Sequence, residues 1–400
     1  MTQMDATQSN AQQRVFAALD RFKIEIPSWG FANTGTRFGK FVQPGAANTI
    51  AEKFADAGEV NRLTGCTPTV ALHVLWDLPN GLADVDSIKS LAAANGIAPG
   101  SINPNLFQLQ EYKFGSIANP DAGIRKQAVD HVIESIKISA ALNSRDISMW
   151  ISDGSNYPGT QSMRRRIGWL EDSLAASYAA MVPGQRMLIE YKPFEPAFYH
   201  TDVADWGMAA HLSQFCGPQA KVLVDTGHHA PATNIEQIVC WLIHTNALGG
   251  FHFNDRKYAD DDLTLGSIDP YQLFRIFHEL HSAGPGADND VAYMIDQSHN
   301  MKGKIEAMIQ SVMAAQDLYA RAALIDQEKL ADLQQSCSLV DAEELFREAF
   351  WTDVRPLVKA WRKQHGLHEN PLQALNEGGY VERISQERAA ANSGAVGSYA

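Results

Sequence analysis

The sequence has few cysteines. It contains four in 400 residues, Cys66, Cys216, Cys240 and Cys337, and no two of them form a C-x-x-C pair. This spacing argues against a zinc knuckle and against a disulfide framework, and it fits a reducing cytoplasm. Long hydrophobic runs are also absent, since no stretch approaches the roughly 18 apolar residues of a membrane span. The polar N-terminus lacks the apolar segment of a secretion signal, so we expect a cytoplasmic protein with no membrane contact.

Positive charge is scarce as well. Lys and Arg number 33 against 46 Asp and Glu, which gives a formal net charge of −13 at pH 7. Nucleic-acid backbones and anionic membranes both favour a basic face, so neither is expected as the main partner. The excess of acid instead suits a protein that holds cations. A G-x-S-x-G nucleophile elbow is missing too, so covalent nucleophilic catalysis has little support.

Short β-branched or apolar runs alternate with helical patterns from about residue 24 to residue 325. This alternation is typical of repeated βα units and a parallel sheet. An open doubly wound sheet would be expected to carry a glycine-rich phosphate turn, which the sequence lacks. We therefore predict an α/β fold, a (β/α)8 TIM barrel. Its predicted strands are Ile24–Trp29, Thr69–Leu75, Gly100–Asn105, Ile147–Ser152, Met187–Tyr191, Lys221–Asp225, Gly250–Asn254 and Val291–Asp296.

The pattern changes beyond Ile325, where it becomes purely helical. The last residues are rich in glycine, serine and alanine, a composition typical of weakly structured chain ends. The predicted organisation is a barrel over 1–325, a helical C-terminal extension over 326–375 and a flexible tail over 376–400.

Four consecutive predicted strands end in side chains that bind metals. Strand five ends at Glu190, strand six at Asp225, strand seven near His252 and strand eight at Asp296, each after apolar neighbours. In barrels of this kind the active site lies at the C-terminal ends of the strands. Any one of these side chains alone is more often a hydrogen-bonded core group or a helix cap. Because four successive strands share the feature, we predict that the four residues bind one divalent cation.

A second set of candidate ligands follows strand seven. Asp260 and Asp262 would point to one side of an extended segment, and His228 lies three residues beyond Asp225. Taken alone, the acidic run around Asp261 would be a solvated loop. Together the residues predict a second, more open site with Asp225 as the bridge. Mixed imidazole and carboxylate ligands favour Mn2+, Co2+, Mg2+ or Zn2+, and the oxygen-rich set favours Mn2+ or Mg2+ among them.

Four more residues are candidates for contact with a substrate. Lys192 lies two residues past Glu190 and therefore on the same side of the strand, where it would contact a substrate oxygen or pair with Glu190. His73 and Trp76 follow strand two, and Trp150 lies in strand four. They offer an imidazole and the flat apolar surfaces that hold a sugar ring, although a buried tryptophan is usually only core.

The segments 188–193, 224–229, 251–255 and 260–262 read LIEYKP, VDTGHH, FHFND and DDD. Together they resemble the broad-specificity bacterial L-rhamnose isomerases, which belong to the xylose-isomerase-like TIM barrels, and the similarity extends through nearly the whole chain. The resemblance implies a homotetrameric aldose–ketose isomerase with two Mn2+ ions per subunit. Such an enzyme interconverts L-rhamnose and L-rhamnulose and accepts other aldoses such as D-allose. As a hypothesis, hydrogen moves between C1 and C2 as a hydride, with two cations polarising the sugar oxygens.

The resemblance also implies roles for individual residues. Lys192, His73 and Trp150 match substrate-contacting positions, Ser298 falls in the strand-eight segment, and Lys192, Asp296 and His73 become the candidate catalytic residues. The structural-metal ligands correspond to Glu190, Asp225, His252 and Asp296. The catalytic-metal ligands correspond to His228, Asp260, Asp262 and the shared Asp225. His252 stands where xylose isomerases have a carboxylate, which favours the rhamnose type.

Two other functions remain open. A ketose 3-epimerase of the same superfamily would use one metal and a pair of glutamates as acid and base. A sugar-binding barrel without catalytic activity would belong to a different class of protein. A metal-dependent nuclease is disfavoured by the net charge of −13. The segment from Arg37 to Phe41, after strand one, would cap its own site or a neighbouring subunit's, or would be a solvated loop.

Overall fold

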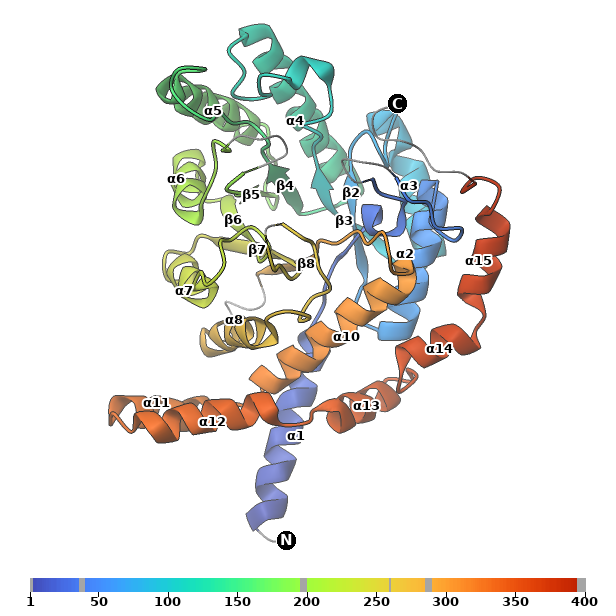
Figure 1. Cartoon of the computed structure of the whole chain (residues 1–400), viewed down its shortest axis with the longest axis vertical. Coiled ribbons are helices and arrows are strands. Elements are labelled where there is room, and N and C mark those ends of the chain that lie inside the picture. The colour runs from blue at the N-terminus through green and yellow to red at the C-terminus, as the bar shows by residue number, and fades with distance from the viewer. Residues whose placement is uncertain (1–2, 36–39, 195–199, 259, 285–289, 394–400) are drawn as a thin grey trace.

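The computed structural model describes residues 3–35, 40–194, 200–258, 260–284 and 290–393. In this part of the chain, eight parallel strands form one sheet in the order β1 to β8. Helices follow the strands and surround the sheet (Figure 1). The strands are β1 (Ile26–Pro27), β2 (Thr69–His73), β3 (Ala98–Asn103), β4 (Asp146–Trp150), β5 (Arg186–Glu190), β6 (Ala220–Asp225), β7 (Leu248–Phe253) and β8 (Ala292–Ile295).

Backbone hydrogen bonds join the first strand to the last. The amide of Glu25 donates to the carbonyl of Tyr293 at 2.7 Å, and the amide of Ile295 donates to the carbonyl of Glu25 at 2.9 Å. The sheet is therefore a barrel, and the predicted TIM-barrel fold is confirmed. The first strand is shorter than predicted, because Pro27 has no N–H to continue the ladder and Trp29 lies in a 3-10 turn, η1 (Ser28–Phe31).

Eight helices cover the barrel in the described residues, and none of the described helices has the length and apolarity to cross a membrane. Short 3-10 turns, η2 (Gly81–Asp84) and η3 (Gln110–Tyr112), follow β2 and β3. The covering helices are α2 (Ile50–Thr64), α3 (Val85–Ala94), α4 (Ala122–Leu142), α5 (Met163–Tyr178), α6 (Trp206–Cys216), α7 (Ile235–His244), α8 (Pro270–Ser282) and α10 (Lys304–Ala322).

Helix α2 shows how the sequence sets these boundaries. The Thr49 side chain accepts a hydrogen bond from the Glu52 amide, and the Glu52 side chain accepts one from the Thr49 amide, which forms a capping box. The helix ends at Gly65, whose φ of +72° lies in the left-handed region that favours glycine. Between these ends, Phe54 and Val60 are fully buried against the barrel. Local capping and core burial thus specify the same helix.

A buried acid lies at the N-terminal end of the barrel. The Glu25 carboxylate accepts hydrogen bonds from the Ser101 amide at 3.0 Å and from the Ser101 hydroxyl at 2.5 Å. A Cβ atom placed on Gly100 would lie 1.6 Å from Glu25 Oε2, so only glycine leaves room for this carboxylate. Burial raises the pKa of Glu25.

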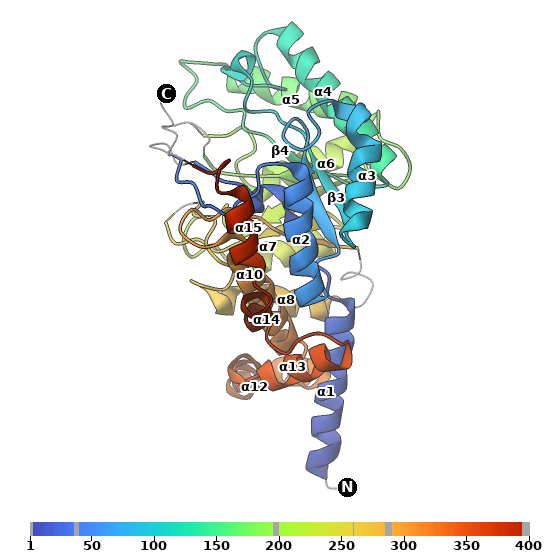
Figure 2. The same ribbon diagram turned by 90° about the vertical axis from the view of Figure 1, so that its right-hand side faces the viewer.

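Six helices lie outside the barrel in the described residues. They are α1 (Gln3–Arg21), α11 (Gln327–Gln335), α12 (Leu339–Trp351), α13 (Arg355–Gln364), α14 (Pro371–Glu377) and α15 (Tyr380–Arg388). The C-terminal ones run along the outside of the barrel as far as α2, and α1 projects past α13 (Figures 1 and 2). The helical C-terminal extension is therefore confirmed.

Helices from both ends of the chain share a small core of their own. Val15 and Leu19 of α1 pack with Ala320 of α10 and with Val358 and Trp361 of α13. The extension is thus attached to α1 and to the last helix of the barrel. The division of the chain at residue 325 stays a prediction.

Helix α15 lies within the segment 376–400, whose flexibility stays a prediction. This helix is held by Arg388, whose guanidinium contacts both carboxylate oxygens of Asp56 in α2, at 2.7 and 2.9 Å. The Tyr380 hydroxyl donates to the same carboxylate at 2.9 Å. A buried ion pair with a distant helix fixes a segment whose composition alone indicates little structure. Residues 394–400 lie outside the described part of the chain.

Candidate metal centre

The first ligand group lies at the C-terminal ends of β5 to β8. Glu190, Asp225, His252 and Asp296 each offer a ligand atom within 4.8 Å of the others. His252 Nδ1 lies 3.2 Å from Glu190 Oε1, 3.7 Å from Asp296 Oδ2 and 3.9 Å from Asp225 Oδ2. One imidazole nitrogen therefore faces three carboxylates. The structure brings together the four residues that the sequence assigns to one cation.

The second ligand group shares Asp225 with the first. Asp225, His228 and Asp260 place their ligand atoms within 4.8 Å of one another. His228 Nε2 lies 3.3 Å from Asp260 Oδ1 and 3.7 Å from Asp225 Oδ2. The other ring nitrogen, Nδ1, lies 2.9 Å from the carbonyl oxygen of Tyr191. When Nδ1 donates its proton to that carbonyl, the Nε2 lone pair is directed at the carboxylates and is available for a cation.

Asp262 borders both groups without belonging to either. Asn254 Nδ2 donates to Asp262 Oδ1 and to Asp225 Oδ1, at 3.1 Å each, and so links the two carboxylates. The expectation of an extended acidic segment is wrong, because Asp262 has a φ of +44°. Burial raises the pKa of Asp262 well above its ordinary value, and Asp260, Asp296 and Asp225 raise it further. A metal-ligand role for Asp262 remains a prediction.

The charges in this cluster oppose one another. Burial raises the pKa of Asp225 to about 7, and the Glu190 and Asp260 carboxylates add to that rise. Burial alone would lower the pKa of His252, but the Glu190, Asp296 and Asp225 carboxylates together outweigh it and raise the value to about 10. Burial would also lower the pKa of His228, but the Asp225 and Asp260 carboxylates raise it to about 9.

Crowded acids and protonated imidazoles thus occupy one buried site. Divalent cations would replace the protons and relieve the repulsion between carboxylates. The donor set of carboxylate oxygens and imidazole nitrogens fits cations such as Mn2+, Mg2+, Co2+ or Zn2+.

Lys192 lies beside the second ligand group. Its buried ammonium forms an ion pair with Asp260 and lies 5.3 Å from the centre of the Trp150 ring. Lys192 thus provides a positive charge between the ligands and an aromatic surface. Its role in binding or catalysis remains a prediction.

An aromatic wall begins at the end of β2. The His73 ring lies 4.0 Å from Trp76 and 5.7 Å from Trp29, and Phe107 joins His73 to Trp150 with centroid distances of 5.5 and 4.9 Å. Burial lowers the pKa of His73 to about 4, so its imidazole is neutral near pH 7. Within the described residues, His73 Nδ1 and Trp150 Nε1 are buried polar atoms with no hydrogen-bond partner. Such atoms are available to the hydroxyl groups of a ligand.

Two residues that contact the candidate ligands were missed by the sequence analysis. Trp29 Nε1 donates to Asp296 Oδ1 at 2.9 Å, and Ser298 Oγ donates to the Trp29 carbonyl at 3.3 Å. The second residue is Asn254, which links Asp225 to Asp262. A signal for Asn254 was its position two residues past His252, hence on the same side of the strand.

In the segment from Arg37 to Phe41, residues 37–39 lie outside the described part of the chain, and Phe41 is 64% exposed.

Solved structures with the same fold include several sugar-processing proteins. The chain matches a 3-keto-D-glucoside 4-epimerase from E. coli with a TM-score of 0.53 and 13% identity, over 73% of this chain and 98% of that one. A xylose isomerase domain protein from Alicyclobacillus acidocaldarius matches with a TM-score of 0.53 and 14% identity, over 76% and 99%. A D-psicose 3-epimerase matches with a TM-score of 0.50 and 14% identity, over 76% and 99%. These likenesses show the fold, a TIM barrel.

Two relatives show the family. The chain is 41% identical over 390 residues to a probable sugar isomerase of Rhizobium meliloti. The aligned region covers 96% of this chain and 90% of that protein. It is also 41% identical over 388 residues to a probable sugar isomerase of Mesorhizobium japonicum. That aligned region covers 95% of this chain and 89% of the other protein. No protein-family model matches the chain. The chain belongs to the family of these two probable sugar isomerases.

Proposed function

We propose that the protein is a two-metal aldose–ketose isomerase that interconverts L-rhamnose and L-rhamnulose and accepts other aldoses such as D-allose. The observation that carries the proposal is the pair of ligand groups joined through Asp225. A single-metal 3-epimerase would need only the first group, whereas His228 and Asp260 supply a second. The family of probable sugar isomerases supports the reaction class.

Each ligand group would hold one cation. Glu190, His252 and Asp296 serve the first site, His228 and Asp260 serve the second, and Asp225 is common to both. Divalent cations bound there would act as Lewis acids that polarise the C1 and C2 oxygens of the sugar. Mn2+ is the cation we propose, because it accepts mixed oxygen and nitrogen ligands.

Lys192 and His73 would contact the sugar itself. The Lys192 ammonium, held by Asp260, would stabilise negative charge on O1. The neutral His73 imidazole would exchange a hydrogen bond with a sugar hydroxyl through its buried Nδ1. Trp150 and Trp76 would cover an apolar face of the ring and exclude water.

The hydrogen would move from C2 to C1 as a hydride, while the O2 proton passes to O1. Exclusion of water by the aromatic wall favours this direct transfer over a route through solvent. Turnover in heavy water should therefore give ketose without deuterium at C1. Deuterium at that carbon would show that a proton is removed and returned instead.

The direct test uses metal-free protein and a panel of aldoses, with and without Mn2+. We expect ketose to form only with the metal and L-rhamnose to be among the substrates. A product inverted at C3 of a ketose would identify a 3-epimerase. Sugar binding without turnover in the loaded protein would identify a binding barrel. Ultracentrifugation of the same samples tests the homotetramer that we propose on the family resemblance.

Asp225→Asn tests the shared ligand. We expect turnover below about one thousandth of the wild-type rate, because the substitution weakens both cation sites at once. The matched control is Asp255→Asn, which makes the same change at the end of β7. Asp255 accepts from the amides of Ile268 and Asp269 at 2.7 and 3.1 Å and lies outside both ligand groups. Equal losses in the two variants would contradict the assigned site.

A further inference from the structure

The chain beyond α15 is bonded to a loop of the barrel's C-terminal face. The buried Asn392 amide donates from Nδ2 to the carbonyls of Pro44 and Ala46, at 2.9 and 2.8 Å. Its Oδ1 accepts from Asn33 Nδ2 at 2.8 Å. All three partners lie in the segment between β1 and α2, and we call the described part of it, residues 28–35 and 40–49, the β1 loop. One side chain near the C-terminus therefore satisfies three polar groups of this loop.

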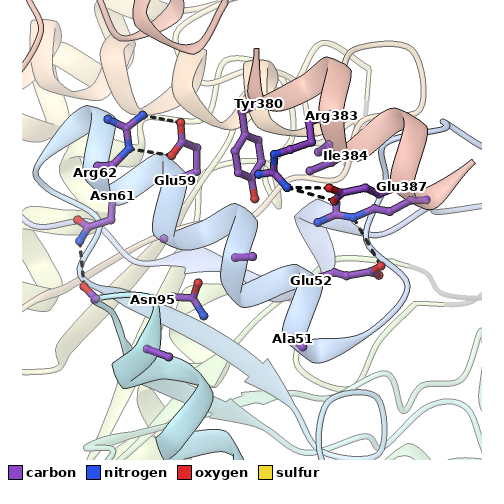
Figure 3. Close-up of a pocket in the computed structure, with 15 residues that line it drawn as sticks. Ala51, Glu52, Glu59, Asn61, Arg62, Asn95, Tyr380, Arg383, Ile384 and Glu387 are labelled. Atoms are coloured by element: carbon purple, nitrogen blue, oxygen red, sulfur yellow. Dashed lines mark hydrogen bonds and ion pairs between the residues drawn. The ribbon is translucent and has the colours of Figure 1, made fainter. Parts of the chain in front are cut away.

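Arg388 anchors the same end of the chain. It pairs with the buried Asp56 of α2, and its Nη1 also donates to the carbonyl of Gly45 at 2.8 Å. Figure 3 shows α15 lying along α2, with Arg383 and Glu387 paired to each other across one turn of the helix. A pocket of about 740 Å³ lies between the two helices, and the charged side chains in it form ion pairs with one another, namely Arg62–Glu59, Arg383–Glu387 and Arg388–Glu52.

The β1 loop in turn contacts the segment that follows β8. Asn33 Oδ1 accepts from the Gln43 amide at 2.8 Å, which joins the two sides of the loop. Gln43 Nε2 donates to the carbonyls of Asn300 and Lys302, at 2.9 and 2.8 Å, and Thr34 Oγ1 donates to Asn300 Oδ1 at 2.7 Å. These bonds connect the loop to the chain just beyond the ligand Asp296.

The inner end of the loop reaches the ligands themselves. Trp29 Nε1 donates to Asp296 Oδ1 at 2.9 Å, and the Trp29 ring lies 5.7 Å from that of His73. A Cβ atom on Gly30 would lie 3.0 Å from the Gln297 carbonyl, so the loop packs closely against the end of β8. Hydrogen bonds and packing therefore run continuously from Asn392 to a metal ligand.

We propose that Asn392 and Arg388 are positioning residues that fix the β1 loop, and through it Trp29, in the arrangement that binds the sugar. This inference rests on the proposed function only for the identity of the bound sugar. The C-terminal extension is then part of the functional centre, because its last side chains determine how often the loop is in the binding arrangement.

Asn392→Ala in the full chain tests the proposal. Loss of its three hydrogen bonds should lower the population of the binding arrangement and raise KM for L-rhamnose by about tenfold. The value of kcat should change less than about twofold, because the bound sugar restores the arrangement. Hydrogen exchange at the amides of residues 40–47 should become faster in the sugar-free protein and return toward the wild-type rate with saturating sugar.

Glu387→Gln is the matched control, since Glu387 is on the same helix, is exposed and pairs with Arg383. It should leave KM and the exchange rates unchanged. Asn33→Ala should also raise KM, and the double variant should raise it by less than the product of the two single effects, because the two residues share one of their hydrogen bonds.

An unchanged KM and unchanged exchange in Asn392→Ala would overturn the proposal, as would an equal effect of Glu387→Gln. If the protein isomerises no aldose at all, the proposed function fails. The hydrogen-exchange measurement alone then decides whether Asn392 positions the β1 loop. Exchange that is faster at residues 40–47 and unchanged in β4 to β7 would still support that role.

Discussion

Asp225 is the residue on which the centre depends most, because one carboxylate serves both ligand groups. Burial and its acidic neighbours raise its pKa to about 7, while the pKa values of His228 and His252 rise to about 9 and about 10. Without a cation, these three groups retain protons that they would release in the unfolded chain. The protonation of the centre is therefore coupled both to folding and to metal binding.

The pH dependence of stability follows from these raised pKa values. At Asp225, the folded metal-free protein binds more protons than the unfolded chain between pH 3.8, the ordinary pKa of an aspartate, and about pH 7. At His228 and His252 it does so from pH 6.5, the ordinary pKa of a histidine, up to about pH 9 and about pH 10. Its stability should therefore fall as pH rises through this window. The lowered pKa values of Glu190 and Asp260 give stability that is lost only in acid.

Cations displace the same protons, so metal binding should strengthen as pH rises. We expect the gain in thermal midpoint from saturating Mn2+ to be larger at about pH 8.5 than at about pH 6. Calorimetry in buffers of different ionisation enthalpy should also show net proton release on binding. A gain that stays constant with pH would contradict the proposed exchange of protons for cations.

The sequence predicts ligands that end strands, because the ends of parallel strands meet at one face of a barrel. Glu190 and Asp296 could be placed in this way. Trp29 could not, since its link to Asp296 depends on the 3-10 turn that follows Pro27. The left-handed φ of Asp262 was equally inaccessible, because aspartate adopts that conformation only where the surrounding contacts favour it.

At the scale of the elements, β3 depends on a glycine that no short motif reveals. Gly100→Ala should lower the free energy of unfolding by about 1–3 kcal/mol, because the added methyl would occupy the position of the Glu25 carboxylate. Turnover per folded molecule should be unchanged, since Gly100 lies near the N-terminal end of β3 and the ligands lie at the opposite ends of their strands. Denaturant unfolding and steady-state kinetics measure the two quantities.

Gly168→Ala is the control for this prediction. Gly168 lies in α5, and a Cβ atom there meets no other atom within 4 Å. The alanine should stabilise the helix by about 0.5–1 kcal/mol. Similar losses from both substitutions would show that the contact with Glu25 is not the cause.

The elements themselves were largely predictable, and their exceptions have local causes. The alternation of apolar runs and helical patterns places all eight strands of the described barrel. Helix α15 was missed because the contact that fixes it, Arg388 with Asp56, joins residues 332 positions apart. Composition reports local tendencies and carries no information about such a partner.

At the scale of the whole molecule, the extension is attached to the rest through Trp361. The ring is 2% exposed, packs between α1 and α10, and donates from Nε1 to Asp20 Oδ1 at 2.7 Å. Trp361→Ala should cost about 3–5 kcal/mol, because it leaves a large cavity where both ends of the chain meet. We expect a lower thermal midpoint by calorimetry.

Trp351→Ala provides the comparison on the neighbouring helix. Trp351 is 72% exposed in α12, so its loss should change the free energy of unfolding by less than about 0.5 kcal/mol. Equal effects of the two substitutions would contradict the role of Trp361 as the link between α1, α10 and α13.

The two ends of the described chain lie on different sides of the barrel. Helix α1 leads into the N-terminal end of β1 and projects away from the sheet (Figures 1 and 2), whereas Asn392 lies against the β1 loop beside the ligand face. Immobilisation on a solid support through α1 would consequently leave the mouth of the barrel open to a flowing sugar solution. A reporter fused after Ser393 would instead begin next to that mouth.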